Sequence, residues 1–465
     1  MTDANDAGNA PRQANSPEGA RSRGQLALEI LPAVFVAFYL SFTIWLFFEG
    51  PIAWPVTNGD SVFLFLAIAV ATLFASFMVG AAAVARGSPL KHWKLVFIGG
   101  AIASCAILFP SAYVYTGKMP WQVLEALSDQ NLAYRTMLDR LVETDGTRAP
   151  LALLRAATYP LVFAVIPLGV LHWNRLGWVL RVLLLASLAS NLVFSILRGT
   201  DRETFDAAIA VATAVLIATG RYCVRDRLAI SDLFARPRTF AALAIACVVA
   251  VMAVNTFSDR KALRYDGDLS KVCVGEQICA DPHHPLLRGL QTGGQFTVAM
   301  MTAYLAQGYY GLSLAMNLDF QSTFGFGHSP LAARIYEAAT GDTSLYERSY
   351  TYRLRDWGWS DENQWSTFFT WIANDIGFPA TIPVIALIGW LGGRAWKDAV
   401  FAGNDRAAIV FCFFVQMCVY LPANNQIMQT LDAYFAIVVW AAVWIWGRRT
   451  AAAASAIGER PGSAM

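Results

Sequence analysis

The sequence predicts an all-α integral membrane protein of about ten transmembrane helices with one large external loop subdomain. Three observations lead to this fold class. Hydrophobic residues make up 56% of the 465 residues and charged residues only 15%, which is far from the composition of a soluble domain. Apolar runs of about 20 residues, the length that crosses a bilayer, recur along the chain. One polar stretch, residues 258–364, separates the first seven runs from the last three.

We expect the spans, in chain order, at residues 26–48, 62–84, 95–115, 151–171, 179–197, 205–219, 240–257, 369–391, 407–421 and 431–446. The sixth and ninth runs are short for a span. A further apolar run, at 296–317, is interrupted by a glutamine and two glycines. A full span there would carry Arg448 and Arg449 to the opposite side of the membrane, so we expect a surface-lying or re-entrant helix.

The basic residues of the short loops fall on one side of this topology. That side includes Arg21, Arg23, Arg86, Lys91, Lys94, Arg175, Arg181, Arg221, Arg225, Arg394, Lys397, Arg448 and Arg449. Because cytoplasmic loops carry an excess of Lys and Arg, both termini are predicted to be cytoplasmic. The polar stretch is then predicted to lie outside the cytoplasm.

The chain therefore divides into five predicted parts. These are a disordered cytoplasmic tail (1–22), transmembrane helices 1–7 (23–257), a periplasmic loop subdomain (258–367), transmembrane helices 8–10 (368–449) and a cytoplasmic tail (450–465). A second external segment, between Lys118 and Arg148, has the apolar spacing of one or two amphipathic helices.

Several function classes are not supported by the sequence. A net charge of +2, spread over many turns, argues against a nucleic-acid partner. The chain contains no phosphate-binding P-loop, dinucleotide fingerprint, HExxH zinc motif or GxSxG elbow. We expect no cofactor and no metal site. The two halves of the chain are not alike, which is not the pattern of a coupled transporter.

Cys273 and Cys279 are the two cysteines of the polar stretch. In an oxidising periplasm they are a candidate disulfide, while two free thiols remain the alternative. A metal site would need more ligands than the neighbouring His283 and His284 supply.

Arg198 and Arg202 lie in the short external turn between the fifth and sixth predicted spans. Arginine near a span is costly, and so short a turn brings both guanidinium groups to one place. They are either a clamp for a phosphate group or two arginines paired with Asp201 and Glu203.

His328 lies in the segment Phe324-Gly-Phe-Gly-His-Ser-Pro330, whose glycines permit close approach of a ligand. Imidazole titrates near neutral pH, so His328 is a candidate catalytic base or phosphate partner. Asp375, just inside the eighth predicted span, is a second candidate base, an arginine partner or a structural group.

Arginine and aromatic residues alternate in the second half of the polar stretch. Residues 304–371 carry 11 of the 31 Tyr and Trp residues of the chain. Aromatic rings stack on sugars and arginines bind phosphate or hydroxyl groups, although the same residues also suit a membrane interface. The candidate substrate-binding residues of this region are Tyr309, Tyr310, Arg334, Arg348, Arg353 and Trp357.

Three segments together resemble the bacterial O-antigen polymerase group, the Wzy-type oligosaccharide repeat-unit polymerases. They are Tyr304-Leu-Ala-Gln-Gly-Tyr-Tyr-Gly-Leu-Ser-Leu-Ala315, then Phe324-Gly-Phe-Gly-His-Ser329, and Trp371-Ile-Ala-Asn-Asp-Ile-Gly377. The resemblance covers the topology and about 80 residues of the loop and its exit.

This resemblance implies a metal-independent, inverting glycosyltransferase. Its partners would be an undecaprenyl-diphosphate-linked glycan, membrane lipid and, as a further candidate, a chain-length regulator. Arg198 and Arg202 resemble the external arginines that hold the diphosphate, and His328 resembles the loop histidine near the acceptor. Two alternatives stay open. One is an O-antigen ligase or another polyprenyl-phosphate-dependent glycosyltransferase, and the other is a flippase or exporter of the lipid-linked glycan.

Overall fold

The computed structural model describes residues 23–142, 148–229 and 267–458 except 276 and 362, together with residues 232, 255 and 262. Within these residues eight helices are long and apolar enough to cross a membrane: α1 (Arg23–Glu49), α2 (Gly59–Ala82), α3 (Trp93–Thr116), α6 (Arg148–Leu171), α7 (Trp178–Leu197), α8 (Arg202–Asp226), α15 (Phe368–Phe401) and α18 (Leu431–Gly458). The protein is thus a multi-pass, all-α membrane protein.

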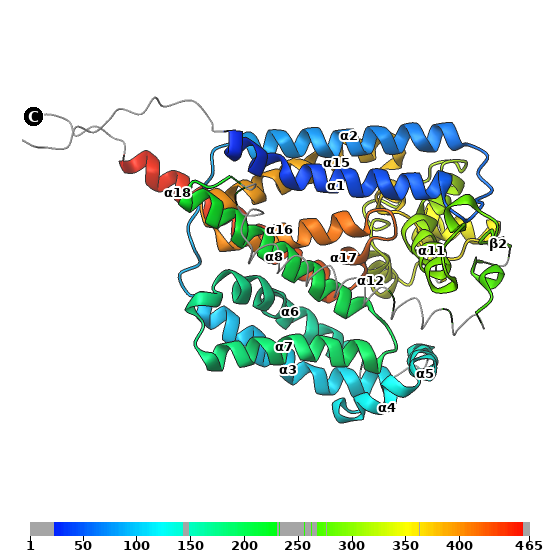
Figure 1. Ribbon diagram of the computed structural model, residues 1–465, viewed down its shortest axis with the longest axis horizontal. Helices are drawn as coiled ribbons and strands as arrows, with labels where there is room; N and C mark the ends of the chain where they lie inside the picture. The colour runs from blue at the N-terminus through cyan, green and yellow to red at the C-terminus, as the bar shows by residue number, and fades with distance from the viewer. Residues whose placement is uncertain are drawn as a thin grey trace, which may run out of the picture.

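Two of the ten predicted spans are not among these eight. The ninth corresponds to α16 (Asp405–Tyr420), which has only 16 residues but lies in the middle of the bundle (Figure 1). The predicted seventh span, 240–257, lies almost entirely outside the described residues. The number ten therefore remains a prediction.

The long helices run side by side, and the shorter elements gather at one end of the bundle (Figure 1). These elements are η1 (Pro120–Gln122), α4 (Val123–Ser128), α5 (Gln130–Val142), η3 (Leu269–Lys271), β1 (Cys273–Val274), β2 (Ile278–Cys279), η4 (Pro285–Leu287), α11 (Thr292–Ala315), α12 (Pro330–Thr340), α13 (Ser344–Glu347), α14 (Tyr350–Arg353), η5 (Leu354–Trp357) and α17 (Gln426–Gln429). We call this end of the molecule the loop end.

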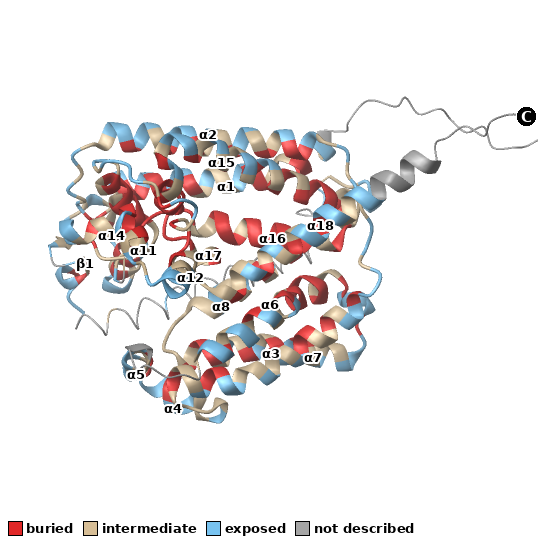
Figure 2. Cartoon of the chain, turned by 180° about the vertical axis from the view of Figure 1, so that it is seen from behind, coloured by how far each residue is buried: buried red, intermediate tan, exposed pale blue. Residues whose placement is uncertain are grey.

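Small residues let α2 and α15 approach closely. A Cβ atom at Gly80 would lie 2.2 Å from the carbonyl oxygen of Trp390, and one at Gly393 would lie 2.0 Å from that of Phe77. Helices that pack within a membrane use small residues in this way, because lipid supplies little hydrophobic drive for their association. Exposed residues lie along the outer faces of the long helices (Figure 2). Many large apolar side chains are exposed, such as Phe38 and Trp178.

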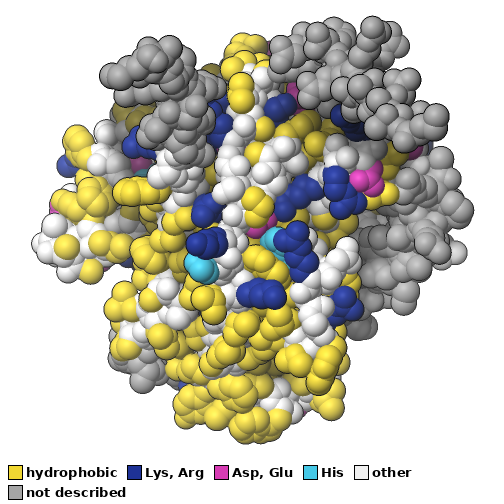
Figure 3. Space-filling model, turned by 90° about the vertical axis from the view of Figure 1, so that its left-hand side faces the viewer, with side chains coloured by type: hydrophobic (Ala, Val, Ile, Leu, Met, Phe, Trp, Pro, Cys, Tyr) yellow, Lys and Arg dark blue, Asp and Glu magenta, His cyan; other side chains and the backbone are white. Residues whose placement is uncertain are grey.

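Lys and Arg side chains gather at the end of the bundle opposite the loops (Figure 3). Several of them form buried ion pairs there, since Lys397 contacts Glu29, Arg448 contacts Asp398 and Arg221 contacts Asp405. A short 3-10 turn, η2 (Trp173–Arg175), joins α6 to α7 at this end. The basic end is the one that the charge pattern assigns to the cytoplasm.

The apolar run at 296–317 forms α11, a buried helix of 24 residues at the loop end. It is not among the eight candidate spans of the described residues. Gly308 packs against the connection that follows α16, where a Cβ would lie 2.1 Å from the carbonyl oxygen of Pro422. The helix thereby packs the loop end against the end of α16.

Candidate functional site

The site is built around a break in α15. Gly377 has φ 75° and ψ 161°, which is not helical and which glycine adopts without a Cβ clash. Pro379 carries no N–H, so the carbonyl of Asp375 loses its usual helical donor. The hydroxyl of Ser322 donates to this carbonyl at 2.9 Å, and the N–H of Thr323 donates to the carbonyl of Asn374 at 3.2 Å. The loop that contains His328 is thus attached to the break.

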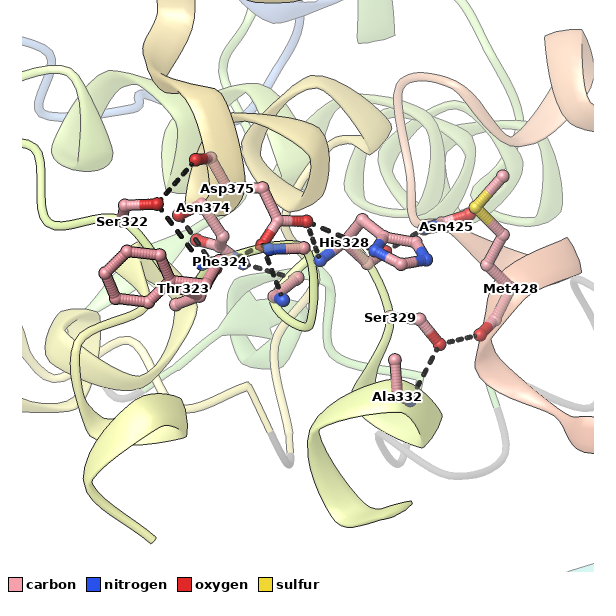
Figure 4. A network of polar contacts seen from close by, with 12 residues as sticks. Ser322, Thr323, Phe324, His328, Ser329, Ala332, Asn374, Asp375, Asn425 and Met428 are labelled. Carbon is pink, nitrogen blue, oxygen red and sulfur yellow. Dashed lines mark hydrogen bonds and ion pairs between the residues drawn. The ribbon is translucent and has the colours of Figure 1, made fainter. Parts of the chain in front are cut away.

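The carboxylate of Asp375 organises this loop (Figure 4). Its Oδ1 accepts from the hydroxyl of Thr323 and from the N–H groups of Gly325 and Gly327, at 2.9 and 2.8 Å. Its Oδ2 accepts from the N–H of His328 at 2.9 Å and contacts Nδ1 of the same residue at 3.1 Å. Five donors occupy the two oxygens, so Asp375 acts on His328 and has little capacity left to take a proton from a substrate.

Asn374 supports the loop from the other side. Its Nδ2 donates to the carbonyl of Gly327 at 2.8 Å, and its Oδ1 accepts from the N–H of Tyr350 at 2.8 Å. The side chain is completely buried. This one amide thus links the His328 loop to α14 and α15. It holds the loop backbone in addition to the contacts that Asp375 makes.

His328 is held between Asp375 and Tyr434. A carboxylate only accepts hydrogen bonds, so the ring nitrogen that faces it, Nδ1, carries the proton. In the neutral imidazole the other nitrogen, Nε2, is then the acceptor, and the hydroxyl of Tyr434 donates to it at 3.0 Å. The His328 side chain is 22% exposed and that of Asp375 is 9% exposed. This is the arrangement of a histidine base oriented by an acid.

Residues 425–434, which we call the bridging segment, connect His328 to the arginines. Asn425 donates through Nδ2 to the carbonyl of His328 at 2.6 Å, and the hydroxyl of Ser329 donates to the carbonyl of Met428. On its other side, the carbonyl of Gln426 accepts from Nη2 of Arg202 at 3.2 Å. The structure therefore brings Arg202 and His328 to one short segment.

Arg198 and Arg202 lie at the turn between α7 and α8, each next to an acid. Arg198 contacts Glu203, and Nε of Arg202 lies 3.7 Å from Oδ2 of Asp206. The predicted ion pair with Glu203 is thus present, whereas Arg202 pairs with Asp206, an acid that the sequence interpretation did not name. Yet Nε of Arg198 is buried and has no acceptor within the described residues. The two side chains as a whole are 22% and 31% exposed, so parts of both guanidinium groups reach the surface.

A third arginine at this end, Arg155 of α6, forms an ion pair with Asp432 of α18. Both Nε and Nη2 contact Oδ2, at 3.2 and 2.8 Å. Trp440 also joins these helices, since its Nε1 donates to the carbonyl of Pro160 at 2.7 Å. The first turn of α18, which contains Tyr434, is therefore fixed against α6.

The other candidate residues lie away from His328. Tyr309 is buried, and its hydroxyl contacts that of Thr43, 2.9 Å away in α1, so it is part of the core. Tyr310 packs between Trp54 and Trp359. The remaining four residues of the set are Arg334 and Arg348, which are exposed, Arg353, which donates to the carbonyl of Asp319, and Trp357, which is 58% exposed.

Cys273 and Cys279 face each other across the two-stranded β1–β2 sheet and form a disulfide. No group of three or more His, Cys, Asp or Glu side chains suitable for a metal ion occurs among the residues that the structure describes. The sheet and its disulfide pack at the start of α11 and do not reach His328.

Sequence reasoning missed several residues of the site. Tyr434 and Arg155 lie inside apolar runs, where they look like ordinary parts of a span. The rest of the bridging segment, which consists of α17 and the first residues of α18, has no distinctive motif. The signal that could have been used was the Asn374-Asp375-Ile-Gly377-Phe-Pro379 order, because a glycine and a proline just after an acid predict a broken helix with free carbonyls.

Gly327→Ala is expected to open the loop around Asp375. A Cβ at this position would lie 2.1 Å from Oγ1 of Thr323 and 2.6 Å from Cβ of Asn374, so the loop must shift. We expect activity to fall by at least about tenfold, since a displacement of about 1 Å at a reacting group costs about 10²-fold. Gly325→Ala, where no atom lies within 4 Å but φ is +90°, separates backbone strain from the clash. Equal activity of Gly327→Ala and wild type would contradict the tight packing.

No family model, curated protein or solved structure matches this chain.

Proposed function

We propose that the protein polymerises undecaprenyl-diphosphate-linked oligosaccharide repeat units at the periplasmic face of the bacterial inner membrane. The observation that carries the proposal is the Asp375–His328–Tyr434 chain of hydrogen bonds. It forms a base at the loop end, opposite the end where Lys and Arg gather. A base on the outer face has no access to cytoplasmic nucleotide sugars, so an activated sugar must arrive on a lipid carrier.

In the proposed reaction an acceptor hydroxyl oxygen attacks the anomeric carbon of the growing glycan. The bond from that carbon to the diphosphate oxygen breaks, and its electron pair leaves with undecaprenyl diphosphate. The anomeric configuration inverts because attack and departure occur on opposite faces. The proton of the acceptor hydroxyl goes to the His328 base, whose imidazolium form is stabilised by Asp375.

The arginines at the turn between α7 and α8 suit the leaving group. Charge develops on the diphosphate as the glycosidic bond breaks, and fixed guanidinium groups stabilise such charge without reorganisation. The partial exposure of both side chains supports this role, as does the contact of Arg202 with the bridging segment. The neighbouring acids keep both arginines neutralised before substrate arrives. No cofactor takes part in the proposal.

The test is the surface polysaccharide of a deletion strain that expresses wild type, Arg198→Ala, Arg202→Ala or His328→Ala. We expect the three variants to lose the long-chain ladder on gels while one repeat unit stays attached. Arg225→Ala is the matched control, since this exposed arginine is at the other end of the bundle beside Asp226. Its ladder should be normal.

Other outcomes would contradict the proposal. Complete loss of attached glycan in the deletion strain would indicate a ligase. Lipid-linked units that accumulate on the cytoplasmic face would indicate a flippase. Normal ladders in both arginine variants would exclude the diphosphate clamp.

A further inference from the structure

The acceptor nitrogen of the His328 base is already occupied. Neutral imidazole has one acceptor nitrogen, and with Nδ1–H directed at Asp375 that acceptor is Nε2. The hydroxyl of Tyr434 donates to Nε2 at 3.0 Å. An acceptor sugar can give its proton directly to the imidazole only if Tyr434 moves away. Otherwise the proton must pass through the hydroxyl of Tyr434.

Tyr434 is held in place from several directions. It belongs to the first turn of α18, where its N–H donates to the carbonyl of Thr430 at 3.0 Å. Two residues earlier, Asp432 is tied to Arg155 of α6 by contacts at 2.8 and 3.2 Å. These contacts fix the backbone of the turn, and the phenol itself is held by its hydrogen bond to Nε2. Direct approach of a sugar to Nε2 would break that bond, whereas a proton transfer through Tyr434 uses it.

The phenol oxygen offers the acceptor capacity that the imidazole lacks. Its hydrogen is directed at His328, and its lone pairs have no donor within the described residues. Elsewhere in the bridging segment, Oδ1 of Asn425 and Oε1 of Gln426 are buried and accept no hydrogen bond in the described part of the chain. The orientation of Asn425 is fixed by its Nδ2 contact with the carbonyl of His328.

The phenol oxygen favours one class of ligand. With its hydrogen directed at His328, it can accept a hydrogen bond from a hydroxyl group but has no hydrogen to donate to a phosphate oxygen. The surroundings of Tyr434 therefore match the hydroxyl-rich acceptor sugar, whereas Arg198 and Arg202 match the diphosphate. The acceptor sugar of the proposed reaction would then lie on the Tyr434 side of the bridging segment, and the diphosphate on the side of the two arginines.

We propose that Tyr434 is a catalytic residue that takes the proton from the acceptor hydroxyl and passes its own to His328. This inference rests on the proposed glycosyl transfer. As the acceptor oxygen bonds to the anomeric carbon, its proton moves to the oxygen of Tyr434, and the proton of Tyr434 moves to Nε2. Tyr434 is unchanged after the step, His328 becomes imidazolium beside Asp375, and the electron pair of the broken bond stays with the diphosphate.

The experiment compares elongation rates of purified wild type, Tyr434→Phe and His328→Ala with lipid-linked repeat units. Tyr434→Phe keeps the ring and removes only the hydroxyl, so we expect a loss of about 10²-fold or more, within the usual range for general base catalysis. Tyr39→Phe is the matched control, because the hydroxyl of Tyr39 donates to the carbonyl of Val419 at 2.7 Å, away from the site. It should elongate at the wild-type rate.

A second measurement separates proton transfer from a structural role. Fluorotyrosine at position 434 has nearly the shape of tyrosine but a more acidic phenol. If Tyr434 must be protonated to pass a proton on, the alkaline limb of the pH–rate profile moves to lower pH. An unchanged profile would overturn the inference.

The outcomes also separate this inference from the proposed function. An active Tyr434→Phe together with an inactive His328→Ala would overturn the role of Tyr434 and leave the glycosyl transfer in place. Wild-type rates in both variants would overturn the base itself. No elongation by the wild-type protein would overturn the proposed function and the inference with it.

Discussion

Asp375→Asn is expected to abolish polymer formation while the protein still inserts in the membrane. Asparagine keeps the shape of the side chain but replaces one acceptor oxygen by an NH2 group. That group would face either the N–H groups of Gly325 and Gly327 or the two nitrogens of His328, so the loop loses acceptors in both orientations. The proton on Nδ1 also loses the carboxylate that fixes it there. We expect a loss of about 10³–10⁴-fold in rate, as when the acid that orients a catalytic histidine is made neutral.

The measurement for Asp375→Asn is the ladder assay combined with the amount of protein in the membrane fraction. Asp342→Asn is the matched control, since this partly exposed carboxylate accepts from the N–H of Ser344 in the same subdomain and does not touch His328. The control should give a normal ladder. A normal ladder from Asp375→Asn would show that the carboxylate is not needed to orient the histidine.

The second large effect is expected at the ion pair between Arg155 and Asp432. Asp432→Ala leaves the Arg155 guanidinium without its partner among apolar helices, where its side chain is only 22% exposed. Removal of one partner of a buried pair costs about 3–5 kcal/mol in the free energy of unfolding. We also expect a loss of activity, because Asp432 helps to fix the turn that carries Tyr434.

This effect is measured by thermal unfolding in detergent for wild type, Asp432→Ala and the double variant Arg155→Met/Asp432→Leu. The double variant replaces the pair by apolar groups, so it should be more stable than Asp432→Ala alone. If Asp432→Ala unfolded at the wild-type temperature, the ion pair would not be what holds α18 against α6.

The sequence predicts the membrane fold well because apolar length is a direct consequence of bilayer thickness. Seven of the ten predicted spans correspond to long helices over nearly their whole length. The sixth predicted span corresponds to α8, which is longer than the predicted segment. The ninth becomes the shorter, central α16, whose burial inside the bundle removes the need for a full lipid-facing length. Topology is thus encoded locally along the chain.

The site is less predictable because its partners come from distant parts of the chain. His328 and Asp375 were both candidate bases from the sequence. Which of them is the base and which orients it depends on contacts between residues that are 47 positions apart. Tyr434 is separated from His328 by 106 positions in the sequence, and it resembles any tyrosine near a membrane surface. Conversely, Tyr309 belonged to an aromatic cluster in sequence, yet it points into the core beside Thr43.

The arginines illustrate the same limit. Their short turn predicted that Arg198 and Arg202 lie close together, and the acid Glu203 was identified as a partner. The contact of Arg202 with Gln426 depends on the bridging segment, 224 residues away in the chain. That contact connects the candidate phosphate side to the histidine side, and no local pattern encodes it.

The most direct test is elongation by the purified protein in liposomes that contain only lipid-linked repeat units. The reaction should proceed without nucleotide sugar and in the presence of a chelator, and it should give a ladder of products that His328→Ala does not form. Absence of products longer than one repeat unit, or equal ladders from wild type and His328→Ala, would contradict a polymerase that uses His328 as its base.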